Sequence, residues 1–265
     1  MPGRIVITSV PHFFIHAVNT HHGICHFSYF FQIAQCTSGN SIKENIKNLK
    51  KNIDQICIDY GKNPEEIKII GASKSKSTNE ISTALECGIT DFGENYLQEA
   101  QPKIQKLSDE NIIWHFIGSI QKRKCREIAL KFDWVHTVDR IEVAEKLNEH
   151  RETLRGKLNI CIQINLDEEE TKSGINLSNL ESFSDKLLSL ENLRIRGLMA
   201  LPKQTNSISK QKNGFSKLSN ALNNLRSVFP QAKELSMGMS NDYLAAIAEG
   251  STIIRIGTNI FGKRK

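Results

Sequence analysis

Lys74 follows a short β-branched run and could act as a nucleophile. The stretch IKIIGASK, residues 67–74, is typical of a buried strand, and the lysine stands where that strand would leave the core. A free lysine has a pKa of about 10.4, so recruiting its neutral form at pH 7 costs about 4.6 kcal/mol. Burial beside other cations lowers this cost, and Lys74 could then form a Schiff base with an aldehyde. The alternative is an ordinary lysine whose amine reaches solvent.

Two glycine-containing stretches near the C-terminus could bind an anion. SMGMS, residues 236–240, and RIGT, residues 255–258, each follow or end an apolar run. Glycine lets backbone N–H groups approach a phosphate closely, and serine and threonine add hydroxyl donors. These stretches indicate a phosphate site, although glycines also occur in ordinary turns. The residues concerned are Ser236, Gly238, Ser240, Gly257 and Thr258.

Eight short apolar runs alternate with helical patterns through most of the chain. The predicted strands cover residues 67–73, 90–95, 112–118, 134–139, 159–166, 193–201, 233–238 and 252–257. A helical pattern fits between each consecutive pair, as in IEVAEKLNEH before the fifth strand. Eight such units close into a barrel, so the sequence predicts a single α/β domain, a (β/α)8 TIM-type barrel. The alternative is an open doubly wound sheet, but the GxGxxG expected after its first strand is absent.

The barrel fold indicates which residues share a site, because the active sites of such barrels lie at the C-terminal ends of the strands. Lys74 follows the first strand, and the glycine stretches follow the seventh and eighth, where this fold commonly binds phosphate. An amine facing a phosphate cradle describes a site for pyridoxal 5′-phosphate, which carries an aldehyde and a phosphate. Arg255 would face its pyridine nitrogen, and since arginine cannot accept a proton, the cofactor would be a poor electron sink. The alternative for Arg255 is an ion pair with Asp242 or Glu249.

Three further residues on predicted strands could line the same pocket. Asn95 ends the second predicted strand, His115 lies in the third and Met199 in the sixth. His115 could pack against the ring or the substrate, or it could equally be a core histidine that bonds a backbone carbonyl. We expect Asn95 and Met199 to be pocket liners of low individual specificity.

The composition is that of an ordinary globular protein. Of 265 residues, 39% are hydrophobic and 24% are charged, and no run reaches the roughly 18 apolar residues that a membrane span needs. The formal charge of +6 is diffuse. The basic cluster QKRKCR, residues 121–126, has no interleaved aromatic residues, which favours a solvated turn over a nucleic-acid site. The six cysteines include no CxxC pair, which favours reduced thiols and a cytoplasmic location.

Residues 1–38 differ from the rest of the chain. They hold five of the eight histidines, and the stretch HHGICH at 21–26 matches no closed zinc pattern. We expect a poorly ordered extension, or translation from upstream of the natural start, rather than a metal site or a signal peptide. Order is expected from Ser41, where SIKE predicts a helix cap and an amphipathic helix runs to about Gly61. The cofactor-binding barrel domain is therefore predicted over residues 39–265.

Together the motifs resemble those of the pyridoxal phosphate homeostasis proteins, the YggS/PROSC family. The motifs are GASKSK, FGENYLQEA, WHFIGSIQ, FDWVHTVDR, INLDEEETKSGI, RGLMALP and LSMGMSNDYLAAIAEGSTIIRIGTNIFG. The resemblance implies a single-domain barrel, similar to the N-terminal domain of alanine racemase, with the cofactor on Lys74 and Arg255 at the pyridine nitrogen. The phosphate contacts that it implies are Ser236, Ser240, Gly257 and Thr258, and the further pocket positions are Asn95, His115 and Met199.

The resemblance also implies a function in vitamin B6 balance. Such a protein binds, buffers and delivers pyridoxal phosphate and has no established reaction of its own. Apo forms of pyridoxal phosphate enzymes are the expected recipients, and a monomer that binds neither nucleic acid nor membrane is expected.

Two rival functions remain from the sequence. An amino-acid racemase needs a second base on the opposite face of the substrate. The racemase relatives take that base from a separate domain, and here only Tyr96 and Tyr243 lie near a strand end. A barrel for another phosphorylated metabolite would need no Schiff base. Whether Lys76 or Lys172 offers a second aldehyde site stays open.

Overall fold

The computed structural model describes residues 41–151, 155–167, 173–203 and 205–263. All of them fall within one unit of the chain, Gln35–Lys265. The predicted extension at residues 1–38, with its HHGICH stretch, lies outside the described residues, and so does Lys172. The predicted barrel domain can therefore be followed from Ser41 onward.

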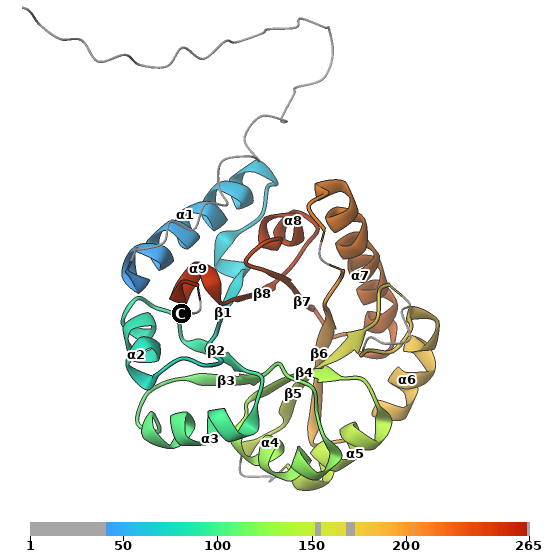
Figure 1. The fold of residues 1–265 in the computed structure, drawn as a ribbon. Coiled ribbons are helices and arrows are strands. Elements are labelled where there is room, and N and C mark those ends of the chain that lie inside the picture. The colour runs from blue at the N-terminus through green and yellow to red at the C-terminus, as the bar shows by residue number, and fades with distance from the viewer. Residues whose placement is uncertain (1–40, 152–154, 168–172, 204, 264–265) are drawn as a thin grey trace, which may run out of the picture. The chain divides into compact units, whose positions relative to one another are not determined.

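The strands form a closed parallel barrel in chain order, as the sequence predicts (Figure 1). β8 returns to pair with β1, with Lys68 opposite Ile253 and Gly71 opposite Ile256, so an open doubly wound sheet is excluded. Each strand agrees with its predicted range to within about two residues at either end. The strands are β1 (Lys68–Ala72), β2 (Asp91–Glu94), β3 (Ile113–Phe116), β4 (Trp134–Val138), β5 (Leu158–Ile164), β6 (Leu193–Ala200), β7 (Glu234–Met239) and β8 (Ile253–Ile256).

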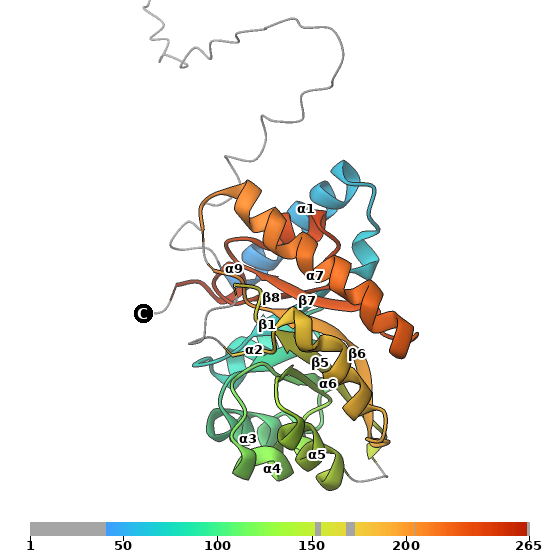
Figure 2. The same ribbon diagram turned by 90° about the vertical axis from the view of Figure 1, so that its right-hand side faces the viewer.

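Helices alternate with the strands and lie outside the ring that the strands form (Figure 1). Figure 2 shows the same arrangement from the side. The helices are α1 (Ile42–Asp59), α2 (Thr78–Glu86), α3 (Leu97–Lys106), α4 (Cys125–Lys131), α5 (Ile141–His150), α6 (Leu180–Leu187), α7 (Ile208–Val228), α8 (Tyr243–Ala248) and α9 (Thr258–Phe261). Short 3-10 helices lie at Pro64–Glu66, Lys122–Lys124 and Leu177–Asn179.

The predicted N-terminal helix is α1, and its cap is confirmed. The Ser41 hydroxyl accepts the backbone N–H of Glu44 at 3.3 Å. Most of its apolar residues are buried, whereas Ile58 is 73% exposed. Two asparagines tie the helix to the end of the chain: Asn45 Nδ2 donates to the Ile260 carbonyl at 3.0 Å, and Asn52 Nδ2 donates to the Tyr243 hydroxyl at 3.3 Å. α1 therefore packs on the helices that follow the last two strands.

The interior of the barrel is filled by side chains, as small barrels require. One buried apolar cluster consists of Ile70, Trp134, Cys161, Met199 and Ile253. The interior also holds polar side chains that are less than a tenth exposed: Asp91, His115, His136, Ser236 and Arg255. Buried polar groups need hydrogen-bond partners, so we expect each of these side chains to have one inside the barrel.

Gly197 lies where β6 passes β7, and no larger residue fits there. A Cβ at this position would lie 1.8 Å from the carbonyl oxygen of Glu234, its partner in the paired strand. We expect Gly197→Ala to lower the free energy of unfolding by about 1–3 kcal/mol, measured by chemical denaturation, because the strands must move apart.

Gly214 in α7 provides the control for that substitution. Its nearest neighbour would lie 3.6 Å from an added Cβ, so Gly214→Ala should raise the free energy of unfolding by about 0.5–1 kcal/mol. Equal effects at the two glycines would contradict the close approach of β6 and β7.

The thiols and the basic cluster agree with their predicted structural roles. Cys57, Cys87, Cys125 and Cys161 are free, and burial raises the pKa of Cys57, Cys125 and Cys161, which behave as small apolar residues. Most side chains of the cluster at 121–126 are exposed. None of the described helices has the length and hydropathy of a membrane span.

Candidate functional site

Four strands bring the predicted rim residues to one mouth of the barrel. These residues, which follow the C-terminal ends of β1, β2, β7 and β8 and are partly or fully exposed, are Lys74, Asn95, Ser240, Gly257 and Thr258. β1 and β8 are neighbours, and a Cβ built on Gly257 would lie 3.7 Å from both the Cβ and the carbonyl oxygen of Ala72. The turn that carries Lys74 and the turn at Gly257 therefore adjoin.

The turn that carries Lys74 is strained and is held in place by α3. Ser75 has a φ of 60°, which is unusual for a residue other than glycine. Its N–H donates to Glu99 Oε2 at 2.9 Å, and Lys103 Nζ donates to the Ser73 carbonyl at 2.8 Å. Strained backbone persists only where its surroundings fix it. The contacts with α3 therefore set the direction in which the chain leaves β1 at Lys74.

Lys103 is itself nearly buried and pairs with Glu94 at the end of β2. Its Nζ lies 2.8 Å from Glu94 Oε1, which also accepts the Ser73 hydroxyl at 2.6 Å. Glu94 is fully buried, and its Oε2 has no partner among the described residues. Desolvation raises the pKa of Glu94 in spite of these hydrogen bonds. The ion pair of Lys103 with Glu94 anchors the Lys74 turn. It also means that the buried Glu94 carboxylate relies on Lys103 to balance its charge.

The loop after β7 is joined to the start of α9. Ser240 Oγ accepts the backbone N–H of Asn259 at 3.4 Å, and Asn259 Nδ2 donates to the Ser240 carbonyl at 3.3 Å. Gly238 has a packing role, whereas its predicted contact with an anion stays a prediction. Its φ is 96°, and a Cβ there would lie 2.7 Å from the Cβ of Ala246, so the packing of α8 on β7 requires this glycine.

Arg255 is buried inside the barrel, close to the end of β8. Nη1 donates to the Ser236 carbonyl at 2.7 Å and to its hydroxyl at 2.5 Å, and Nη2 donates to the Ala200 carbonyl at 3.0 Å. Burial lowers the pKa of Arg255 to about 10, so it remains a cation at neutral pH. It forms no ion pair with a described residue, so the alternative pairing with Asp242 or Glu249 is not observed. Among the described residues, no hydrogen-bond partner of its Nε–H is found.

His115 is a buried core histidine, but its partners are side chains rather than a backbone carbonyl. Its Nε2 lies 2.8 Å from Asp91 Oδ1, and its Nδ1 lies 2.9 Å from Nε2 of His136. His136, which the sequence reasoning missed, lies 2.8 Å from the Ser236 hydroxyl through Nδ1. Ser236 is fully buried and its hydroxyl is shared between His136 and Arg255. The described partners of its hydroxyl thus lie in the interior, and its predicted phosphate contact stays a prediction.

Met199 and Lys76 also have defined neighbours. Met199 is 1% exposed and packs in the interior cluster with Trp134, so any contact with a ligand would come from below the mouth. Lys76 Nζ lies 3.2 Å from Glu80 and 3.4 Å from the Phe261 carbonyl oxygen. These contacts give Lys76 a structural role between α2 and α9.

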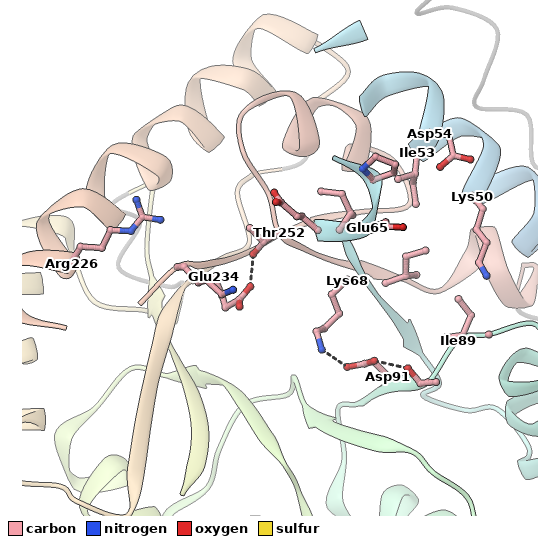
Figure 3. Close-up of a pocket in the computed structure, with 17 residues that line it drawn as sticks. Lys50, Ile53, Asp54, Glu65, Lys68, Ile89, Asp91, Arg226, Glu234 and Thr252 are labelled. Carbon is pink, nitrogen blue, oxygen red and sulfur yellow. Dashed lines mark hydrogen bonds and ion pairs between the residues drawn. The ribbon is translucent and has the colours of Figure 1, made fainter. Parts of the chain in front are cut away.

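A separate cavity of about 1080 Å³ lies at the other end of the barrel (Figure 3). It is lined by residues at the N-terminal ends of strands, including Lys68, Asp91, Glu234 and Thr252. None of the predicted site residues lines it. Active sites of this fold lie at the C-terminal face, whereas the N-terminal face contributes to stability, so the mouth is the better candidate.

The comparisons with known proteins agree with this fold. Residues 40–265 match the family model described as alanine racemase, N-terminal domain. The pyridoxal phosphate homeostasis protein of Escherichia coli K12 is 41% identical over 228 residues, which cover 85% of this chain and 97% of that protein. The protein of the same name from Haemophilus influenzae is also 41% identical, with 84% and 96% covered. The chain belongs to the pyridoxal phosphate homeostasis protein family. The resemblance found in the sequence is confirmed.

Solved structures place this family in a wider group with the same fold. PipY of Synechococcus elongatus PCC7942, solved with PLP bound, is 31% identical with a TM-score of 0.74, covering 84% of this chain and 100% of that one. Alanine racemase from Corynebacterium glutamicum is 14% identical with a TM-score of 0.64, and the match covers 62% of its chain. At 14% identity, the similarity to the racemase shows only that the two chains share a fold.

Proposed function

We propose that this chain binds pyridoxal 5′-phosphate at the barrel mouth through a covalent link to Lys74 and holds and delivers it in pyridoxal phosphate homeostasis. The observation that carries the proposal is the meeting of the Lys74 turn and the Gly257 turn at one rim, close to a buried arginine. Membership of the homeostasis family supports it, as does the PipY structure with PLP bound.

The residues at the mouth fit the chemistry of this cofactor. Ser240 and Thr258 offer hydroxyl groups beside the backbone of Gly257, where a side chain is lacking, which suits a phosphate group. Arg255 offers a donor from a buried guanidinium, which suits a ring nitrogen. Lys74 is partly buried and follows a strand whose exit is fixed by α3. These residues together offer an amine for the aldehyde, donors for the phosphate and a donor for the ring nitrogen.

Each residue then has a stated task. Lys74 would hold the cofactor covalently, while Ser240, Gly257 and Thr258 would hold its phosphate. Asn95 would line the pocket at the end of β2, and Met199 would pack beneath it. Ser236 and His115 would act below the mouth, through Arg255. When bound, the cofactor supplies an aldehyde that condenses with a neutral primary amine.

The donor set disfavours transamination and decarboxylation. Arg255 donates but cannot accept a proton, so it would hold the ring nitrogen unprotonated and weaken its ability to stabilise a carbanion. The second base that a racemase needs is also not evident among the tyrosines near strand ends. Tyr243 is 4% exposed and its hydroxyl accepts from Asn52 on α1, while Tyr96 is 59% exposed at the start of α3. We therefore propose a non-catalytic carrier, with an amino-acid racemase as the alternative.

The remaining parts of the proposal concern where the carrier acts. The free thiols of the described residues favour a reducing compartment, and we propose the cytoplasm. We also propose that the chain acts as a monomer and that apo enzymes receive the cofactor from it. Transfer to a purified apo enzyme, followed by that enzyme's recovered activity, would measure delivery.

Titration with pyridoxal phosphate tests the proposed function. The purified protein should turn yellow and saturate at about one equivalent, because one lysine forms the link. The loaded protein should then exchange no α hydrogen of L-alanine in heavy water. A protein that stays colourless contradicts both the carrier and the racemase and favours a barrel for another phosphorylated metabolite. Exchange of the α hydrogen would favour the racemase.

A further inference from the structure

A chain of hydrogen-bonded side chains crosses the barrel interior from β2 to β8. Asp91 bonds His115 at 2.8 Å, His115 bonds His136 at 2.9 Å, His136 bonds the Ser236 hydroxyl at 2.8 Å, and that hydroxyl bonds Arg255 at 2.5 Å. Each of the five side chains is less than a tenth exposed. At the far end Lys68 lies 3.0 Å from Asp91, at the cavity of the N-terminal face (Figure 3). The chain therefore leads from the N-terminal face to the buried arginine near the end of β8.

The two ends of the chain fix the direction of every hydrogen bond in it. The Asp91 carboxylate can only accept, so a neutral His115 carries its proton on Nε2, donates it to Asp91 and leaves its Nδ1 as an acceptor. A neutral His136 then carries its proton on Nε2 and donates it to His115 Nδ1. His136 Nδ1 is thereby left as an acceptor, so the Ser236 hydroxyl donates its proton to it and accepts from Arg255, which can only donate. Both histidines are thus required to be the neutral Nε2–H tautomer.

The surroundings keep both histidines neutral. Burial lowers the pKa of His115, with Asp91 opposing the effect and Lys68 adding to it. Burial also lowers the pKa of His136 well below its usual range, with His115, Arg255 and Lys68 all disfavouring a proton there. The His115 ring stacks on Trp134 with centroids 5.6 Å apart, and the His136 ring lies 5.8 Å from the same indole. Packing and charge therefore hold the rings in one orientation.

The chain also supplies the buried Arg255 with a distant counter-charge. Its guanidinium has no carboxylate in ion-pair contact among the described residues, yet every dipole between it and Asp91 is aligned in the same sense. Aligned hydrogen bonds strengthen one another in a low-dielectric interior. The carbonyl and hydroxyl of Ser236 hold Nη1, and the Ala200 carbonyl holds Nη2, so the Ser236 hydroxyl is one of three contacts that set where the Nε–H of Arg255 lies.

We propose that Asp91, His115, His136 and Ser236 are positioning residues that orient Arg255 toward the pyridine nitrogen of the bound cofactor. The proposal rests on the proposed function, in which Arg255 faces that nitrogen. To Ser236 and His115, which the proposed function already places beside Arg255, it adds Asp91 and His136. None of them would touch the cofactor. They would act through Arg255, so their effect should be confined to the ring nitrogen.

A comparison of two ligands separates this role from a structural one. The ligands are pyridoxal phosphate and its carbocyclic analogue, in which a C–H group replaces the ring nitrogen. The wild-type protein should prefer pyridoxal phosphate by about tenfold, the equivalent of one hydrogen bond of about 1.4 kcal/mol. The variant His136→Phe keeps a ring against Trp134. It should bind pyridoxal phosphate and the analogue almost equally well, while its affinity for the analogue stays at the wild-type value. Ser236→Ala, which removes the last link, should do the same.

Ile253→Val provides the matched control inside the barrel. Ile253 lies on β8 in the interior cluster but outside the chain of hydrogen bonds, so its variant should keep the tenfold preference. The proposal is overturned if His136→Phe keeps the wild-type preference, or if it weakens both ligands equally, which would indicate a merely structural role.

NMR of the cofactor-free wild-type protein tests the polarity of the chain without any variant. The ring nitrogens of His115 and His136 should both report the neutral Nε2–H tautomer at pH 7. A proton on Nδ1 of either ring would overturn the proposal. A wild-type protein that stays colourless, or shows no preference between the two ligands, would contradict the proposed function instead. The two failures are therefore distinguishable.

Discussion

Lys74→Ala should stay colourless when mixed with pyridoxal phosphate, whereas the wild-type protein turns yellow. Lys74 lies just after the end of β1, at the rim beside Gly257. Among the described residues, no other lysine follows β1 so directly at this rim. Removing its amine removes the group that condenses with the aldehyde, so the loss of colour should be complete. Visible absorbance during a titration measures it, and the residual affinity should reflect the phosphate and ring contacts alone.

Lys76→Ala is the matched control for this substitution. Lys76 lies two residues further along the same loop, but its amine is engaged by Glu80 and the Phe261 carbonyl. Its variant should turn yellow with the wild-type stoichiometry. Colour retained in Lys74→Ala and lost in Lys76→Ala would show that the second lysine carries the cofactor.

Lys103→Met should have the largest effect on stability among the substitutions considered. It leaves the Glu94 carboxylate buried without its cation, and breaking a buried ion pair from one side costs about 3–5 kcal/mol. The free energy of unfolding, measured with urea at pH 7, should fall by that amount. The double variant Glu94→Gln with Lys103→Met should recover part of the loss, since no charge is then left unpaired.

The effect of Lys103→Met should also depend on pH. The pKa of Glu94 is already raised in the folded protein above its usual 4.5, and removing Lys103 raises it further. A carboxyl group with a raised pKa favours the fold fully below its unfolded pKa, and that contribution is lost as the pH rises through its folded pKa. The deficit should therefore be small near pH 4 and full at neutral pH.

An exposed ion pair serves as the control for Lys103→Met. Lys43 and Glu86 pair at 3.3 Å, but their side chains are 64% and 65% exposed. Lys43→Met should change the free energy of unfolding by less than about 1 kcal/mol, because solvent screens such pairs. If Lys103→Met costs no more than Lys43→Met at pH 7, Glu94 is not the buried carboxylate that the structure describes.

The fold was predictable from the sequence because strand and helix periods alternate without interruption. Eight apolar runs with a helical pattern between them leave few arrangements other than a closed parallel barrel. Since that fold assembles its site from the C-terminal ends of the strands, the positions of Lys74, Asn95, Ser240, Gly257 and Thr258 at one rim followed from chain order alone.

The residues beneath the rim were harder to assign because their roles depend on contacts across the barrel. Ser236 and Gly238 stand in the same stretch as Ser240, yet Ser236 bonds Arg255 and Gly238 accommodates α8. A glycine or serine near a strand end gives no signal that separates these roles. Only the alternation of residues along β7 indicates that Ser236 faces the interior.

His136 and the pair of Lys103 with Glu94 show two further limits of sequence reasoning. The period of two along β4 places Trp134 and His136 on the same face, which could have indicated an interior histidine beside His115. The contact of Lys103 with the Lys74 turn joins residues 30 positions apart, and a lysine in a helix ordinarily reaches solvent. Such contacts become visible only when the elements are packed.

Borohydride reduction of the loaded protein, followed by peptide mapping, tests the central claim most directly. Reduction makes the link between lysine and aldehyde permanent, so the modified residue can be located by mass spectrometry. We predict that the added mass lies on the peptide that contains Lys74, at about one equivalent per chain. Modification at another lysine, with Lys74 unmodified, would contradict the account.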